Sequence, residues 1–194
     1  MLYVASACGP HQQVLRPAQL EEPTLVRDLH REVLLGADAV FDTTEGVQER
    51  IEGQAVVLEQ ARASLRVDSL GSVGIMQPAT DPERSGLPAL IEEEVWVRLA
   101  RSLRLTAWIL DRIDPVRRLT HVAPTVALLS AAYLGWRTRD EHTASPNSIQ
   151  MSMNVGDRVS VGLTPAARPR GALTYEVQEL TEDFIALLKR TYKA

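Results

Sequence analysis

The stretch GWRTRDEHTAS, residues 135–145, is the densest group of reactive side chains in the chain. It holds an indole, two guanidiniums, two carboxylates, an imidazole and several hydroxyls. In a small hydrolase, an imidazole would act as general base, a carboxylate would orient it, and Thr143 or Ser145 would be the nucleophile. The candidates for the acid–base roles are His121, Asp140, Glu141 and His142.

The same stretch fits two simpler structures. Neighbouring side chains in a loop point apart, whereas catalytic groups usually come from separate segments. Asp140 and Glu141 can pair with Arg137 and Arg139, and the hydroxyls can cap local backbone. The pattern therefore favours a solvated loop, with an anion-binding or partner-binding edge as the second interpretation and catalysis as the third.

A second candidate site consists of arginines and one tryptophan. At 100° per residue, Arg101, Arg104, Arg112 and Trp108 share one side of a predicted long helix, opposite a wide apolar face. Guanidiniums interleaved with an indole can hold phosphates and stack on bases. The predicted anion-binding or nucleic-acid-binding set is Arg98, Arg101, Arg104, Trp108, Arg117, Arg118, Arg137 and Arg139. The alternative is a solvated helix face whose tryptophan packs on a neighbouring element or a second copy.

Metal and cofactor motifs are weak. Cys8 and His11 have a C-x-x-H spacing that could form half a zinc site, but no second ligand pair follows. Gly71 and Gly74 form a G-x-x-G without the ending of a P-loop. We therefore expect no metal and no cofactor.

Composition narrows the class of protein. The 194 residues are 45% hydrophobic and 24% charged, which is typical of a globular chain. We expect one domain over residues 23–194, preceded by an irregular N-terminal arm over residues 1–22. The first residues of this arm can form a short strand, and the rest is an irregular lead-in. The net charge of -4 gives no global attraction to nucleic acid or anionic lipid.

The sequence also predicts the cellular compartment of the chain. The single cysteine excludes an intrachain disulfide and favours the cytoplasm. Arginine is used far more than lysine, which is typical of a GC-rich bacterial genome. No apolar run approaches the roughly 20 residues of a membrane-spanning helix, so no membrane contact is expected.

Periodicity predicts the elements of the first half. Apolar spacing indicates a helix from Pro23 to about Gly36, and a second helix from Thr43 or Thr44 through residue 64. Alternation over residues 64–77, with a turn at Leu70-Gly71, predicts a β-hairpin. After a loop, a long helix is expected from Pro88 to Asp114.

The second half is less regular. Residues 119–134 favour a strand, but a buried helix remains open because alanine and leucine dominate the later part. Residues 157–165 predict a strand, and residues 171–194 an amphipathic terminal helix. The segment 145–157 is expected to be a mobile connection.

The predicted fold class is therefore α+β, with about four helices packed on a small, mostly antiparallel sheet. One helix is long and central, and another is C-terminal and amphipathic. The leading functional prediction is a non-enzymatic, cytoplasmic module that binds a protein partner or itself as a homo-oligomer. The alternatives are a nucleic-acid or phosphate-ligand binder and a small hydrolase.

Overall fold

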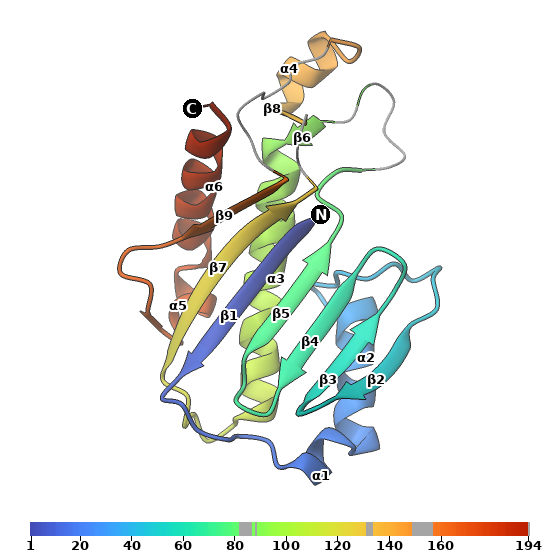
Figure 1. Cartoon of the computed structure of the whole chain (residues 1–194), viewed down its shortest axis with the longest axis vertical. Coiled ribbons are helices and arrows are strands. Elements are labelled where there is room, and N and C mark those ends of the chain that lie inside the picture. Colours follow the sequence, from blue (N-terminus) through green and yellow to red (C-terminus); the bar gives the residue numbers. More distant parts are fainter. Residues whose placement is uncertain (82–86, 88, 131–133, 149–156, 194) are drawn as a thin grey trace.

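The computed structural model describes residues 1–81, 87, 89–130, 134–148 and 157–193, and over these residues the fold is α+β (Figure 1). The strands of its main sheet are β1 (Leu2–Gly9), β2 (Gln48–Glu52), β3 (Ala55–Glu59), β4 (Ser64–Asp68), β5 (Val73–Gln77), β7 (His121–Leu129), β9 (Arg158–Gly162) and β10 (Arg168–Pro169). A separate parallel pair consists of β6 (Ala89–Ile91) and β8 (Gly135–Arg137). The helices are α1 (Pro17–Leu20), α2 (Pro23–Leu35), α3 (Glu92–Ile113), α4 (Arg139–Ala144), α5 (Ala172–Tyr175) and α6 (Val177–Lys193).

The main sheet is antiparallel at every strand pairing. Its order is β10-β7-β1-β5-β4-β3-β2, and β9 pairs with β7. The central pair β1 and β7 runs in register from Leu2 opposite Leu128 to Gly9 opposite His121. The start of the expected N-terminal arm is therefore a strand in the middle of the sheet, and the sheet is larger than predicted.

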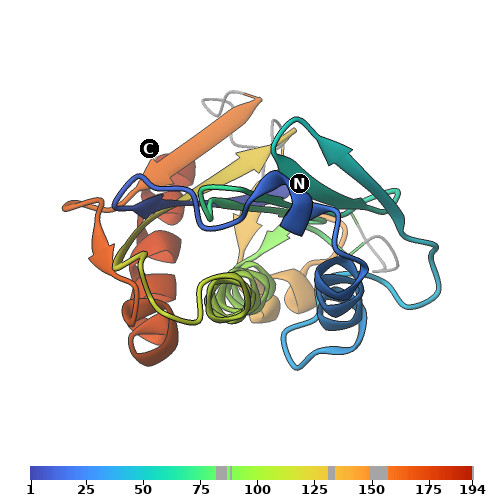
Figure 2. The same ribbon diagram turned by 90° about the horizontal axis from the view of Figure 1, so that it is seen from below.

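Three long helices cover one face of this sheet. Figure 2 shows α2, α3 and α6 side by side beneath the strands. Among the described residues, no helix lies on the opposite face. The prediction of helices packed on a mostly antiparallel sheet is confirmed, although three of the described helices are substantial rather than about four.

Helix α3 forms the centre of the helical layer, as its periodicity predicted. Leu99 and Leu103 are fully buried against the sheet, and each such burial stabilises the fold by roughly 1.5–3 kcal/mol. Ser102 and Thr106 are also buried, and their hydroxyls donate to the carbonyls four residues earlier. The Gln77 amide donates to Ser102 Oγ at 2.8 Å and so ties β5 to the helix. The helix begins at Glu92 rather than Pro88 because the residues before it form β6.

The helix predicted from Thr43 or Thr44 to residue 64 is wrong. This segment forms the hairpin of β2 and β3, with Gly53 at the turn in the left-handed region, at φ 59°. The run Val56-Val57-Leu58 is buried on both sides of β3, and β-branched residues suit a strand packed on two faces better than a helix. Glutamine, glutamate and arginine, which suit helices, lie in the exposed edge strand β2.

Several other predictions are settled by the same structure. The hairpin over residues 64–77 is confirmed as β4 and β5, and residues 121–129 are a strand, β7, rather than a helix. The strand predicted over 157–165 is confirmed as β9. The terminal helix is divided into α5 and α6 at Glu176.

Residues 135–145 do not form the predicted loop. They form β8 and then α4, which begins at the N-cap Thr138. Most of the connection predicted over 145–157 lies outside the described residues.

None of the described helices is both long and apolar enough to cross a bilayer.

Candidate functional site

The predicted catalytic residues lie at opposite ends of the molecule. His121 is the first residue of β7 and is exposed, and its Nδ1 lies 2.9 Å from the Thr120 hydroxyl. Asp140, Glu141 and His142 lie in α4, beside the other end of the sheet (Figure 1). Among the described residues, neither imidazole is hydrogen-bonded to a carboxylate.

Helix α4 uses its polar groups to begin a helix. The Thr138 hydroxyl accepts the Glu141 N–H at 3.2 Å, and the Glu141 carboxylate accepts the Thr138 N–H at 2.8 Å. This reciprocal pair is a capping box, which satisfies two backbone donors at a helix start. The Glu141 carboxylate is therefore engaged in a hydrogen bond with the backbone, and Asp140 is exposed beside it.

His142 is buried without a hydrogen-bond partner among the described residues. Its side chain is 5% exposed, and neither ring nitrogen has an acceptor or donor within reach. A buried polar group without a partner costs stability. We therefore predict that His142→Leu raises the free energy of unfolding by about 1–2 kcal/mol, measured by urea unfolding. A fall of similar size would show that the imidazole has a partner that stabilises the native state.

The arginines of α3 hold the helical layer together. Arg104 Nε donates to Asp38 at 2.7 Å, and Arg112 Nε donates to Asp28 of α2 at 2.9 Å. Arg101 is exposed, whereas Trp108 is half-buried against the core. Two guanidiniums on the predicted face thus pair with carboxylates of α2 and of the loop that follows it.

The remaining arginines of the predicted set are far apart. Arg137 is buried, and its guanidinium donates to the Ser145 carbonyl at 2.9 Å and to the Ser148 hydroxyl. Arg139 is exposed on α4, close to the start of α3. Arg117 and Arg118 follow the end of α3, which spans about 33 Å at 1.5 Å per residue. Arg98 is half-buried in the first half of α3. The structure does not bring the eight residues into one patch.

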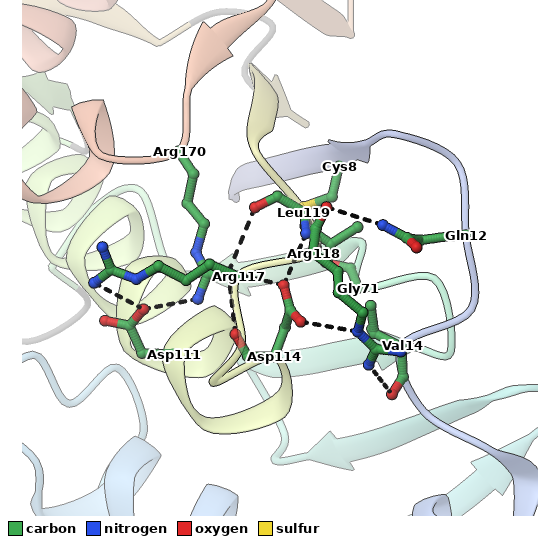
Figure 3. Close-up of polar contacts among 10 residues, drawn as sticks. All are labelled: Cys8, Gln12, Val14, Gly71, Asp111, Asp114, Arg117, Arg118, Leu119 and Arg170. Carbon is green, nitrogen blue, oxygen red and sulfur yellow. Dashed lines mark hydrogen bonds and ion pairs between the residues drawn. The ribbon is translucent and has the colours of Figure 1, made fainter.

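An ion network that the sequence analysis missed lies at the end of α3 (Figure 3). The Asp114 side chain is fully buried and accepts hydrogen bonds from three groups. The donors are Arg170 Nη1 at 2.9 Å, Arg118 Nε at 3.2 Å and the Leu119 N–H at 2.8 Å. Arg170 is 9% exposed, and its Nη2 donates to Asp111 at 2.7 Å. The partners of Arg170 precede it by 56 and 59 residues, so no local motif indicates them.

Asp114 is held as a carboxylate. Burial alone would raise its pKa, but hydrogen bonds from the backbone and from Arg118, together with the charge of Arg170, outweigh burial and lower the pKa. A buried carboxylate that accepts several hydrogen bonds is stabilised in its charged form. The network is therefore an ionic clamp between the end of α3 and the segment before α5.

Cys8 lies at the edge of this network. Its thiol donates to the Gly71 carbonyl at 3.1 Å, and burial raises its pKa to about 11. The sulfur is therefore protonated at neutral pH, and the thiol is a weaker nucleophile than the thiolate. Within the described part of the chain, no three histidine, cysteine, aspartate or glutamate side chains lie close enough to hold a metal ion.

The open face of the sheet divides into two halves of different chemistry. On the first half, the outward side chains are small or uncharged. We call this half the small-residue face: Tyr3, Ala5, Ala7, Gly74, Met76, Ala123, Thr125, Ala127, Ser160 and Gly162. Strand register places them in neighbouring rows, with Thr125 between Ala5 and Gly162. Among the described residues, the basic side chains nearest to it are Arg158 and His121, which stand at its two ends.

Tyr3 covers a gap on this face. A Cβ on Gly74 would lie 2.8 Å from the Tyr3 hydroxyl, so the ring lies over the glycine of the neighbouring strand. Aromatic side chains placed over strand glycines shield the backbone there. The side chains of the small-residue face consequently project only a short distance from the sheet. Tyr3 and Met76 are the largest of them.

The second half of the open face carries four paired charges. We call these the ion-pair ladder: Arg50, Glu52, Glu59 and Arg66. Arg50 bonds both glutamates, and Arg66 reaches Glu52 at 2.8 Å. Hydrogen bonding to Arg50 lowers the pKa of Glu52. The ladder has no net charge, and it is the polar covering expected of a sheet face in water.

Known proteins give no further indication. No protein-family model matches the chain, and neither a curated protein nor a solved structure is significantly similar to it.

Proposed function

We propose that the chain is a non-enzymatic interaction module that associates with a second copy of itself through the open face of its sheet. The observation that carries this proposal is the small-residue face. Sheet faces in contact with water usually carry long polar side chains, as the ion-pair ladder does on the same sheet. The charge-free half departs from that pattern over four neighbouring strands.

Small outward side chains favour close contact with another flat surface. Alanine, glycine and serine lose little side-chain entropy when they are covered. Two sheet faces pack about 10 Å apart, and low side chains allow this approach without rearrangement. Exposed apolar patches with a polar margin are typical of protein interaction sites.

The electrostatics favour a second copy over a strongly charged partner. The ion-pair ladder has equal numbers of positive and negative groups, and the small-residue face has none. A face of this kind neither attracts nucleic acid nor repels its own copy. A two-fold axis across the strands would place the small-residue face on itself and the ladder on the ladder.

The dimensions predict a weak dimer. With strands about 4.8 Å apart and about 3.4 Å per residue, the small-residue face covers roughly 350–500 Å². A standard interface buries about 800 Å² on each partner. Both halves of the open face are therefore needed, and we expect association in the micromolar range.

The test is sedimentation velocity with the full chain from 2 to 200 µM, concentrations chosen around this affinity. The wild-type average mass should rise from 21.4 kDa towards twice that value. Thr125→Arg places a charge at an exposed position in the middle of the small-residue face and should keep the chain monomeric. Thr24→Arg, at an exposed position of α2 in the helical layer, should behave as wild type.

Two results would contradict self-association. A wild-type chain that stays at 21.4 kDa at 200 µM excludes it, and the face would then serve a different protein. A Thr125→Arg variant that dimerises as the wild type does would place the interface elsewhere.

We also propose a reducing compartment, the cytoplasm, as the place of action. The chain has one cysteine, and its half-buried, protonated thiol is engaged with a backbone carbonyl. Chains without disulfides are typical of reducing compartments.

A further inference from the structure

A cleft of about 370 Å³ lies against the ion network, between the end of α3 and the segment that contains α5. This volume is within the range of small-molecule sites. The polar and aromatic groups that line it come from three separated segments: Asp111, Arg117, Thr120, Arg170, Thr174 and Tyr175.

The floor of the cleft is rigid and cationic. Arg170 is held by Asp114 on one side and by Asp111 on the other, so its guanidinium is fixed in place. The network contains three guanidiniums and two carboxylates, which leaves one net positive charge in a chain whose net charge is -4. Anions are attracted to such a local excess of positive charge.

Arg117 is the clearest sign of a ligand site. Its φ is 56°, in the left-handed region that glycine and asparagine adopt far more readily than arginine. The side chain is 71% exposed, and its Nη2 lies 3.9 Å from Asp111 Oδ1, beyond hydrogen-bond distance (Figure 3). Among the described residues, the Arg117 guanidinium thus has no strong partner at the mouth of the cleft. Backbone strain of this kind gathers at functional sites.

An aromatic ring completes the lining. Tyr175 is the last residue of α5 and is 84% exposed, an unusual position for a large aromatic side chain. Thr120 and Thr174 also line the cleft, and the Thr120 hydroxyl lies 2.9 Å from His121 Nδ1. Guanidinium and hydroxyl donors suit the three oxygens of a phosphate, and an exposed ring suits a flat heterocycle.

We propose that this cleft binds a small organic phosphate of the nucleoside monophosphate class. Arg117 is the main phosphate ligand, the threonine hydroxyls add donors, and the base stacks on Tyr175. Phosphate suits the site better than carboxylate because it offers more acceptor oxygens and a second negative charge to a site with an excess of cation. Arg170 orients Asp111 and contributes positive potential from beneath.

The test is isothermal titration of the full chain with adenosine monophosphate, inorganic phosphate and adenosine. Arg117→Asn removes the guanidinium and places a residue that tolerates the left-handed backbone. We expect it to weaken binding of adenosine monophosphate at least tenfold while the melting temperature rises. Arg62→Asn, at an exposed turn distant from the cleft, removes the same charge and should leave binding unchanged.

Two further variants test the chemistry of the ligand. Asp111→Asn removes a negative charge from the cleft but keeps the acceptor for Arg170, and it should tighten phosphate binding several-fold. Tyr175→Ala should weaken adenosine monophosphate and leave inorganic phosphate unaffected. Looser binding in Asp111→Asn would indicate a cationic ligand and overturn the proposal. Absence of wild-type binding at millimolar ligand, or equal losses in Arg117→Asn and Arg62→Asn, would overturn it as well.

Discussion

Asp114→Ala is expected to lower the free energy of unfolding by about 3–5 kcal/mol, because it leaves the buried guanidinium of Arg170 without its inner partner. The change also removes the acceptor of the Leu119 N–H and of Arg118 Nε. For a chain of this length the melting temperature should fall by roughly 6–20 °C. Urea unfolding followed by tryptophan fluorescence and circular dichroism measures the loss.

A thermodynamic cycle separates the ion pair from the loss of side-chain volume. The two single variants of the cycle are Arg170→Met, which removes the cation, and Asp114→Leu, which removes the anion. The double variant leaves no buried charge unpaired. The double variant should lose much less stability than the sum of the two single changes. Asp111→Ala is the matched control, since Asp111 bonds the same guanidinium from a 55% exposed position and should cost less. Equal losses for the two aspartates would contradict a central role for Asp114.

The same carboxylate predicts a dependence of stability on pH. The pKa of Asp114 in the folded chain lies below its ordinary value of 3.8. A carboxylate with a lowered folded-state pKa stabilises the fold fully above its unfolded-state pKa. That contribution is lost as the pH falls through the lower folded-state value. Unfolding of the wild type between pH 7 and pH 2 should therefore show a loss in acid that is smaller in Asp114→Asn.

The parts of this fold that depend on local patterns could be predicted from the sequence. Helix α3 has apolar residues at helical spacing over six turns, and the face that this spacing indicates is the buried one. The β4–β5 hairpin was predicted from alternation on both sides of Gly71, and Gly71 adopts the positive φ that such a turn requires. In both elements, the spacing of the apolar residues and the residue that interrupts it indicate the same structure.

The predictions fail where one stretch of sequence fits both the helical period and the strand period. Residues 44–64 have apolar residues at spacings compatible with a helix, but the glycine at position 53 is the turn of a hairpin. The charges of β2 pair across strands, and Arg66 reaches Glu52 from β4. Such pairing depends on which strands become neighbours. The sequence around residue 50 carries no sign of it.

The candidate sites were harder to predict than the elements. Arg117 and Arg118 were singled out for their charge, but the two aspartates and Arg170 that surround them come together only in the fold. For α4, the pattern Thr138-x-x-Glu141 does indicate a capping box, and it explains why that stretch is a helix rather than a catalytic loop. In β1, small residues at Ala5 and Ala7 mark the outward positions where polar side chains would be expected.

Gly71→Ala is expected to cost about 2–5 kcal/mol, the sum of backbone strain and a steric clash. The residue has a φ of 83°, and an added Cβ would lie 2.4 Å from Leu119 Cδ1. Gly53→Ala is the matched control. Gly53 has a φ of 59° but nothing within 4 Å of the same position, so its loss should be only about 1–2 kcal/mol.

The difference between the two alanine variants isolates the packing of Leu119 against the β4–β5 turn. Leu119 is fully buried, and its N–H is fixed by Asp114 Oδ2 at 2.8 Å, so the side chain has little room to retreat. Shortening it should therefore relieve the clash: Gly71→Ala combined with Leu119→Val should lose less stability than the two changes added together. Equal losses for Gly71→Ala and Gly53→Ala in urea unfolding would instead mean that Leu119 moves freely. In that case Asp114 would fix the backbone N–H of Leu119 without fixing the position of its side chain.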